Sequence, residues 1–260
     1  MAHGLRDDIV RPYLNAHPHK VFFVTVSGAH LYGFESPNSD YDLRGAHITA
    51  ARAMLGLSLP RETYEILDRA SPIEMDLVTH DVRKYFQMLM GRNGYVLEQI
   101  CSPLVVHAEP EFEEIRSIAM RCITRHHRHH FRSFASHQWD AVAGSSAGTV
   151  KGLLYTYRPL LAGIHLMREG VVESNLRRLN EVFRLGYIDE LIERKVSGDE
   201  KQLIGEIDMT FHTREFDRLN AALDTAAVAS GLPEDVVVGD QLEDLLIRLR
   251  LATLDSRLQR

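Results

Sequence analysis

Cysteine is scarce in this 260-residue sequence, which contains Cys101 and Cys122 and no C-x-x-C pair. Both lie in segments with helical periodicity, so we expect neither a disulfide scaffold nor a zinc ribbon, and we expect a reducing, cytoplasmic location. Long hydrophobic runs are also missing: no stretch approaches the roughly 20 apolar residues of a membrane span. Residues 1–4 lead into a charged segment rather than a signal peptide, so no membrane partner is expected.

A net positive charge is absent as well. The formal net charge is -6, which argues against indiscriminate binding of nucleic acid. The charge is uneven: residues 121–170 carry seven Lys and Arg, two acidic residues and six His, whereas residues 187–260 carry nine basic and sixteen acidic residues. The basic segment 121–170 can attract a polyanion, whereas the acidic segment 187–260 cannot. Internal repeats and low-complexity tracts are not found, and the length suits one large domain or two small ones.

The most informative stretch runs from Val21 to Gly45, VFFVTVSGAHLYGFESPNSDYDLRG. Its β-branched and aromatic residues at 21–26 predict a buried strand, and the small residues at 27–29 predict a turn. Asp40 and Asp42 follow, separated by one residue, and in a strand such residues point to the same face. Two carboxylates beside a glycine turn can hold a divalent cation and the phosphates that it neutralises. A solvated acidic turn is the alternative.

Gly28, a small residue at 29, ten intervening residues and then Asp-Tyr-Asp-Leu resemble the signature of the DNA polymerase β-like nucleotidyltransferase superfamily. The longer string SGAHLYGFESPNSDYDLRG is similar to a narrower branch of predicted nucleotidyltransferases that includes the RNA-ligase-associated RlaP proteins. The resemblance implies an α+β fold: a nucleotidyltransferase core with a small mixed sheet at about 1–105, and an all-helical domain at 106–260 that closes the cleft. It covers the first 105 residues well and lapses beyond about residue 180.

This resemblance also implies the chemistry. An NMP would be transferred from an NTP, ATP included, to a hydroxyl group with the help of Mg2+ or Mn2+, and pyrophosphate would be released. Asp40 and Asp42 would be catalytic metal ligands, and Gly28, Ala29 and His30 would contact the nucleotide. The family usually has Gly-Ser at this turn, so Ala29 lacks a hydroxyl contact worth roughly 1 kcal/mol.

A third carboxylate is expected on a neighbouring strand, predicted at residues 73–79. Asp76 is our choice as catalytic residue and metal ligand, because DLVTHDVRKYF resembles the way this strand enters a helix in the RlaP-like branch. Glu74 lies on the same face by alternation and is the rival. Arg44 and His47 could reach phosphate, although Arg44 is expected to pair with a nearby acid.

The helix after that strand should stop near residue 91, with Asn93 as a turn or cap and Glu98 on a wall of the site. Beyond Pro110 the periodicity predicts helices throughout. Residues 144–148 predict a flexible break.

Lys151 and Arg158 share one face of the next predicted helix. In the branch that the chain resembles, a Lys and an Arg at this spacing lie across from the carboxylates, which implies contacts with the triphosphate or pyrophosphate. A basic face ion-paired to solvent or acids is the alternative. His126 and His130 have an i, i+4 spacing that can bind zinc, but no third ligand is evident. A solvated helix face that contacts RNA or triphosphate is favoured there.

The acceptor is the most open question. RlaP-like proteins are associated with RNA ligation and repair, so the resemblance implies an RNA end, tRNA included, and the basic segment 121–170 agrees with this. A small molecule or a protein hydroxyl would suit the same core. A non-catalytic nucleotide or RNA sensor is the rival from another class, with Ala29 as its support. The sequence leaves the oligomeric state open.

Overall fold

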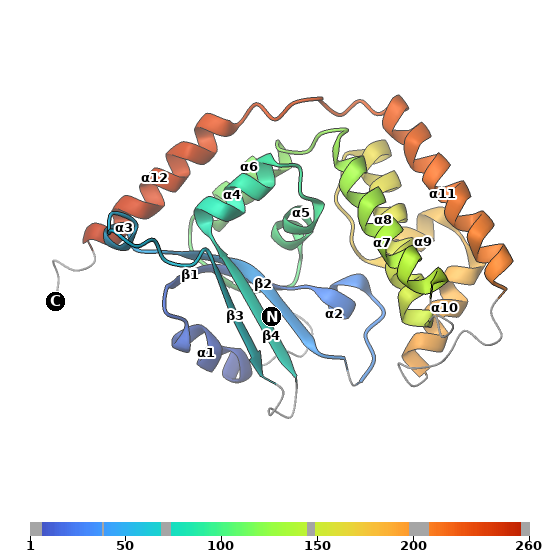
Figure 1. The fold of residues 1–260 in the computed structure, drawn as a ribbon, viewed down its shortest axis with the longest axis horizontal. Helices are drawn as coiled ribbons and strands as arrows, with labels where there is room; N and C mark the ends of the chain where they lie inside the picture. The colour runs from blue at the N-terminus through green and yellow to red at the C-terminus, as the bar shows by residue number, and fades with distance from the viewer. Residues whose placement is uncertain (1–6, 38, 69–73, 145–148, 198–207, 256–260) are drawn as a thin grey trace. The chain divides into compact units, whose positions relative to one another are not determined.

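The structure is a computed structural model that describes residues 7–37, 39–68, 74–144, 149–197 and 208–255. It combines a five-stranded mixed sheet with helices, most of which follow the sheet in the chain, so the expected α+β class is confirmed (Figure 1). The predicted break at 144–148 lies almost entirely outside the described residues. None of the described helices is long and apolar enough to cross a membrane.

The sheet has the strand order β3-β4-β2-β1-β5. Its strands are β1 (Lys20–Val26), β2 (Tyr41–Ile48), β3 (Thr63–Asp68), β4 (Met75–Asp81) and β5 (Val105–Ala108). β2 and β4 are parallel, and the pairs β1–β2, β1–β5 and β3–β4 are antiparallel. The strands predicted at 21–26 and 73–79 correspond to β1 and β4. β5 was not predicted, because four residues are too few to show a period.

The chain divides into two compact units. The sheet unit comprises Met1–Gly28, Asp40–Cys122 and Val236–Arg260, and the helical unit comprises Ala29–Ser39 and Ile123–Asp235. This division differs from the expected boundary near residue 105 in two ways. The last helix of the chain belongs to the sheet unit, and the segment between the glycine turn and Asp40 belongs to the helical unit.

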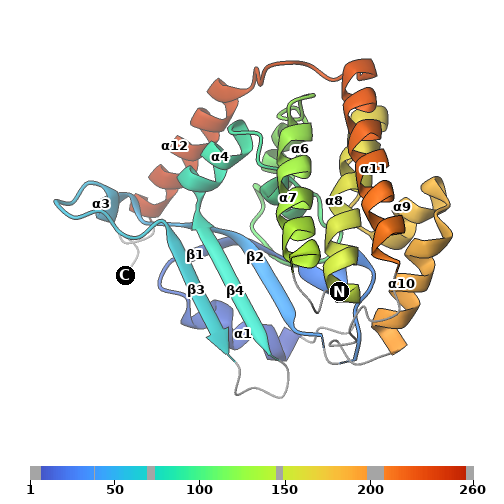
Figure 2. The same cartoon turned by 45° about the vertical axis from the view of Figure 1, so that its right-hand side comes forward.

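Helices cover both faces of the sheet. Those of the sheet unit are α1 (Asp7–Ala16), α3 (Ala51–Met54), α4 (Val82–Met90), α5 (Gly94–Cys101), α6 (Phe112–Met120) and α12 (Gly239–Asp255). α4 and α6 lie over one face, and α1 lies against the other (Figures 1 and 2). α12 contacts α3, α4 and α6, although more than a hundred residues separate it from them in the chain.

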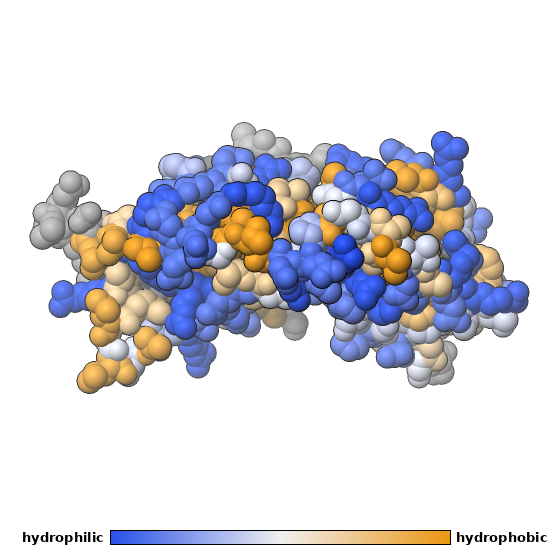
Figure 3. Space-filling view, turned by 90° about the horizontal axis from the view of Figure 1, so that it is seen from above, coloured by the Kyte–Doolittle hydropathy of each residue, from blue (hydrophilic) through white to orange (hydrophobic). Residues whose placement is uncertain are grey.

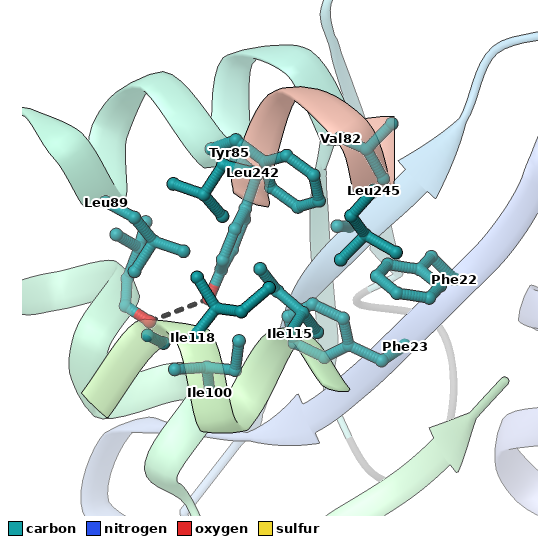
Figure 4. Close-up of a cluster of buried hydrophobic side chains, with 14 of the residues drawn as sticks. Phe22, Phe23, Val82, Tyr85, Leu89, Ile100, Ile115, Ile118, Leu242 and Leu245 are labelled. Atoms are coloured by element: carbon teal, nitrogen blue, oxygen red, sulfur yellow. Dashed lines mark hydrogen bonds between the residues drawn. The ribbon is translucent and has the colours of Figure 1, made fainter. Parts of the chain in front are cut away.

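A single hydrophobic cluster explains why α12 belongs to this unit. Phe23 of β1, Tyr85 of α4, and Leu242 and Leu245 of α12 are all buried within it (Figure 4). The Tyr85 hydroxyl donates a hydrogen bond of 2.7 Å to the carbonyl oxygen of Val96, so its burial leaves no polar group unsatisfied. Each large apolar side chain buried in this way contributes about 1.5–3 kcal/mol. On the face shown in Figure 3 hydrophilic residues prevail, and hydrophobic residues form small groups.

A buried ion pair also attaches α12 to the sheet. Arg250 donates to Asp81, which begins α4, and to the carbonyl oxygen of Thr49, which follows β2. The side chains of Arg250 and Asp81 are 12% and 2% exposed. Burial raises the pKa of Asp81, but the hydrogen bonds from Arg250 and Thr49 outweigh it and hold this pKa below its ordinary value.

Replacing Arg250 with glutamine is expected to lower the free energy of unfolding by about 3 kcal/mol, because it leaves a buried carboxylate without its counter-ion. Urea denaturation followed by circular dichroism measures this loss. Arg248 is the matched control: it lies on the same helix but pairs with Glu114 and Asp244 at the surface. Arg248→Gln should leave the midpoint nearly unchanged. Equal shifts for the two variants would contradict a special role of the buried pair.

Three histidines lie together beside β1 and β2. His17 and His47 both form hydrogen bonds with the Thr79 hydroxyl, at 2.8 and 2.9 Å. The ring of His19 stacks on that of His47 with centroids 4.7 Å apart. His47 is fully buried, so it cannot reach a phosphate as its sequence position suggested.

Burial is the main reason why the pKa values of these three histidines are low. Burial, together with smaller effects of the neighbouring His19 and His17, lowers the pKa of His47 to about 3, although Asp81 raises it. Burial also lowers the pKa values of His17 and His19. All three side chains are therefore neutral in the folded protein near pH 7.

Stability is expected to fall on acidification, because the unfolded chain takes up protons on these histidines before the folded chain does. The free energy of unfolding should be level above about pH 7 and fall between about pH 6.5 and pH 3, by up to 1.4 kcal/mol per pH unit from His47. His17 and His19 change it in the same direction. Urea denaturation at pH 7 and pH 5 measures the slope. His47→Gln should reduce this slope, whereas replacing the exposed His137 with glutamine should not. An unchanged slope in His47→Gln would contradict the assignment.

The helical unit is built around one long buried helix. Its helices are α7 (His127–Ala143), α8 (Val150–Glu169), α9 (Leu176–Phe183), α10 (Gly186–Ser197) and α11 (Met209–Ala229). α8 contacts the other four, and α7, α8 and α11 lie side by side in Figures 1 and 2. The short helix α2 (Gly28–Tyr32) begins at the last residue of the first sheet-unit segment and continues into this unit.

Candidate active site

The predicted glycine turn and the predicted carboxylates meet within the sheet unit. Gly28 follows β1 with φ +62°, a left-handed conformation that favours glycine. The backbone N-H of Ser27 donates a hydrogen bond of 2.7 Å to the carbonyl oxygen of Asp42. A Cβ atom placed on Gly28 would lie 1.9 Å from Oδ2 of Asp42. The turn therefore packs directly on this carboxylate and leaves no room for a side chain.

Asp42 and Asp76 are neighbours across the parallel pair of strands. They are register partners in β2 and β4, and their side chains are 21% and 30% exposed. Asp40 directly precedes β2 and is half-buried. The rival Glu74 precedes β4, and its side chain is exposed to solvent. Of the two candidates for the third carboxylate, Asp76 is the one beside Asp42.

Arg44 lies between these two carboxylates. Its Nη2 donates to Oδ1 of Asp42 at 2.8 Å and to Oδ2 of Asp76 at 2.7 Å. Its Nη1 donates to the carbonyl oxygens of Leu43 and Asp76 at 2.9 and 2.7 Å. The expectation that Arg44 pairs with a nearby acid is confirmed, and it pairs with two.

Tyr95 on α5 holds the remaining side of the guanidinium. Nε of Arg44 donates to the Tyr95 hydroxyl at 2.7 Å. Burial lowers the pKa of Arg44, but Tyr95, Asp42 and Asp76 outweigh burial and raise it above its ordinary value, so the guanidinium stays charged. α5 begins at Asn93, whose side chain accepts the N-H groups of Tyr95 and Val96, so the prediction of a cap is confirmed. The sequence offers no signal that links Tyr95 to Arg44, because they are far apart in the chain.

Carboxylate oxygens are what Mg2+ prefers. Asp42 carries such oxygens against the glycine turn, and Asp40 directly precedes the strand that carries Asp42. Fewer carboxylates are available for a metal ion than the three that the resemblance implies. Among the described residues, no three His, Cys, Asp or Glu side chains converge as a metal site requires. At Asp42 and Asp76 the reason is Arg44, which takes one oxygen from each. The residues fit a divalent ion on Asp40 and Asp42 better than one shared by three carboxylates.

The remaining predicted nucleotide ligands lie in the helical unit. Ala29 is buried, and His30 and Lys151 are half-buried. Arg158 is 2% exposed, and its guanidinium carbon lies 3.9 Å from the centroid of the Tyr32 ring, a cation–π contact. The pairing of Arg158 with α2 was not foreseen, because helical spacing alone does not tell which face is buried.

The histidines at the start of α7 stack on neighbouring rings. His126 stacks with His129, and His130 stacks with Phe134 at 6.4 Å between centroids. Burial, with a contribution from Arg158, lowers the pKa of His130 to about 4. The described residues add no third ligand to His126 and His130. Glu98, the expected wall residue, is buried in α5.

Sequence reasoning also missed how the segment before Asp40 is held. Lys195 of α10 is 2% exposed, and its Nζ donates to the hydroxyls of Ser36 and Ser39 at 3.1 and 3.2 Å. Gly33 packs directly against the side chain of Asn175, since a Cβ atom on Gly33 would lie 2.4 Å from Oδ1 of Asn175. The helical unit therefore fixes the segment that leads from α2 to Asp40. A lysine on an amphipathic helix gives no sequence signal for such a contact.

Comparisons with known proteins agree with this geometry. Residues 6–248 match the family model of RlaP, the RNA repair pathway DNA polymerase beta family. The uncharacterized protein MJ0002 of Methanocaldococcus jannaschii is 28% identical over 177 residues, which cover 67% of this chain and 72% of that protein. The uncharacterized protein YcgL of Bacillus subtilis is 23% identical over 215 residues, which cover 78% of this chain and 81% of that protein. The family match extends beyond residue 180, where the motif resemblance lapses, and ends in α12.

Proposed function

The chain belongs to the RlaP family of polymerase β-like proteins of an RNA repair pathway, and from this we propose that it transfers an NMP from an NTP to a hydroxyl group at an RNA end. Pyrophosphate is the second product. The proposed reaction depends on Mg2+ or Mn2+ and involves little covalent chemistry by the protein. Its side chains act by positioning the reactants and balancing charge.

The contact between Gly28 and Asp42 is the observation that carries this proposal. A residue without a side chain, in a left-handed turn, lies directly on a carboxylate at the edge of the sheet. Such a turn lets the backbone approach a triphosphate closely, and the carboxylate beside it can hold the cation that neutralises the phosphates.

Each polar residue then has a proposed role. Asp40 and Asp42 hold the divalent ion, which when bound stabilises charge on the triphosphate. Asp76 is the third carboxylate of the site, and its backbone and side chain both accept from Arg44. Of the two basic residues on α8, Lys151 is the better candidate for phosphate, because Arg158 would have to leave its stack on Tyr32.

Incorporation of label tests the proposal. Each of the four α-32P NTPs is incubated with the protein, Mg2+ or Mn2+, and a pool of tRNA and RNA oligonucleotides. Label should enter RNA with the unmodified protein and not with the Asp40→Ala/Asp42→Ala double variant. Glu74→Ala is the matched acidic control and should stay active, because this side chain is exposed and precedes β4.

Failure of the label to enter RNA, with NTP binding demonstrated, would contradict the RNA acceptor and direct the search to small-molecule or protein hydroxyls. A second candidate function is a nucleotide or RNA sensor without catalysis, which the missing hydroxyl at Ala29 favours. A sensor would show a rise in melting temperature with Mg2+ and NTP and no turnover.

A further inference from the structure

The guanidinium of Arg44 is bonded to a residue outside the two strands that carry Asp42 and Asp76. Its Nη1 and Nη2 donate to atoms of β2 and β4, including both carboxylates. Its Nε donates at 2.7 Å to the hydroxyl of Tyr95, which lies 51 residues further along the chain on α5. Because a guanidinium is a rigid planar fork, a bond at Nε fixes the direction in which the other two nitrogens point.

Tyr95 lies in the first turn of α5, where neighbouring groups fix the backbone. Its N-H donates to Oδ1 of Asn93 at 2.9 Å, and the buried hydroxyl of Tyr85 donates to the carbonyl oxygen of Val96 at 2.7 Å. Burial raises the pKa of Tyr95, although Arg44 lowers it, so the hydroxyl is neutral near pH 7. A neutral hydroxyl on a fixed helix end can hold a charged side chain in one orientation.

We propose that Tyr95 is a positioning residue of the active site, which keeps the guanidinium of Arg44 on Asp42 and Asp76. This inference rests on the proposed function, because it assumes that these carboxylates take part in nucleotide transfer. The two aspartates are register partners, and the guanidinium balances their charges and fixes one oxygen of each. The side chain of Arg44 is 12% exposed. Without the hydroxyl its Nε would be a largely buried donor, and the guanidinium would turn to find another acceptor.

Replacing Tyr95 with phenylalanine removes the hydroxyl and keeps the ring. We expect kcat for label transfer to fall about ten-fold and the KM for NTP to stay within about two-fold, because the carboxylates lose their orientation while the site keeps its charge. Tyr13→Phe is the matched control and should leave kcat unchanged. The Tyr13 hydroxyl also donates to a charged group of the sheet unit at 2.7 Å, namely Oδ2 of Asp68.

Two further measurements show whether Tyr95 acts through Arg44. In an Arg44→Gln background, Tyr95→Phe should change kcat by less than about two-fold, because the partner is already gone. By nuclear magnetic resonance, the Nε-H of Arg44 should be protected from exchange with water in the unmodified protein and in Tyr13→Phe. This protection should be lost in Tyr95→Phe. Arg44→Lys assigns the signal, because it removes this N-H group.

An unchanged kcat in a folded Tyr95→Phe, or unchanged protection of the Nε-H, would overturn the inference and leave the proposed function in place. Absence of transfer by the unmodified protein would overturn the proposed function and the inference with it. Should Tyr95→Phe fail to fold, Arg44→Lys decides the matter. Lysine keeps the charge without the planar fork, so kcat should fall about ten-fold if the orientation of the guanidinium matters. An unchanged kcat in Arg44→Lys would overturn the inference.

Discussion

Replacing Gly28 with alanine is expected to reduce kcat/KM for nucleotide transfer by about 100-fold or more, corresponding to about 2.7 kcal/mol, while the protein stays folded. The added Cβ would lie 1.9 Å from Oδ2 and 2.8 Å from Cγ of Asp42, so one of the two groups must move. Asp42 cannot yield easily, because its other oxygen is held by Arg44. The shift therefore falls on the turn or displaces the oxygen that we propose binds the metal ion, and either change is expected to lower activity.

Gly170→Ala is the control that separates backbone strain from this collision. Gly170 ends α8 with φ +67°, and a Cβ there would meet only Leu232 at an ordinary 3.6 Å. It should lose about 1 kcal/mol of stability from the left-handed conformation and keep its activity. Single-turnover transfer and urea denaturation of both variants measure the two effects. Similar activity losses would contradict a role of the Gly28–Asp42 contact.

The parts of the site that the sequence predicts are those that depend on neighbours in the chain. The β-branched and aromatic residues at 21–26 were enough to predict the strand before Gly28, and the small residues at 27–29 were enough to predict the turn. The choice of Asp76 over Glu74 rested on the family resemblance. The structure places Asp76 level with Asp42, because β2 and β4 pair in parallel register.

The features that the sequence does not predict are those in which the apolar face of one helix packs against an element far away in the chain. The period of α12 shows that Leu242 and Leu245 share an apolar face, but not that this face returns to the sheet unit. Likewise, the spacing of Lys151 and Arg158 predicts one helix face, yet Arg158 is buried on Tyr32. An arginine next to an Asp-x-Asp motif predicts an ion pair. The guanidinium of Arg44 makes five hydrogen bonds, and one of them is to Tyr95 on α5. No local sequence pattern reveals that contact.

Replacing Asp42 with asparagine is expected to reduce transfer by about 1,000-fold, or about 4 kcal/mol, which is more than the loss from Asp76→Asn. Asparagine keeps the shape, and its amide oxygen can still accept from Arg44, so the fold should persist. What disappears is the negative charge beside the Gly28 turn, where the divalent ion is proposed to bind. Asp76→Asn removes a charge that Arg44 already balances, and we expect a loss of about ten-fold.

Single-turnover label transfer over a range of Mg2+ concentrations measures this difference, and circular dichroism confirms that both variants are folded. Raising the Mg2+ concentration should recover part of the activity of Asp42→Asn if the lost charge bound the ion. It should do nothing for Asp76→Asn, whose partner is an arginine. Equal losses with equal metal dependence would show that the two carboxylates share one ion, and Arg44 would then have to leave its position between them during the reaction.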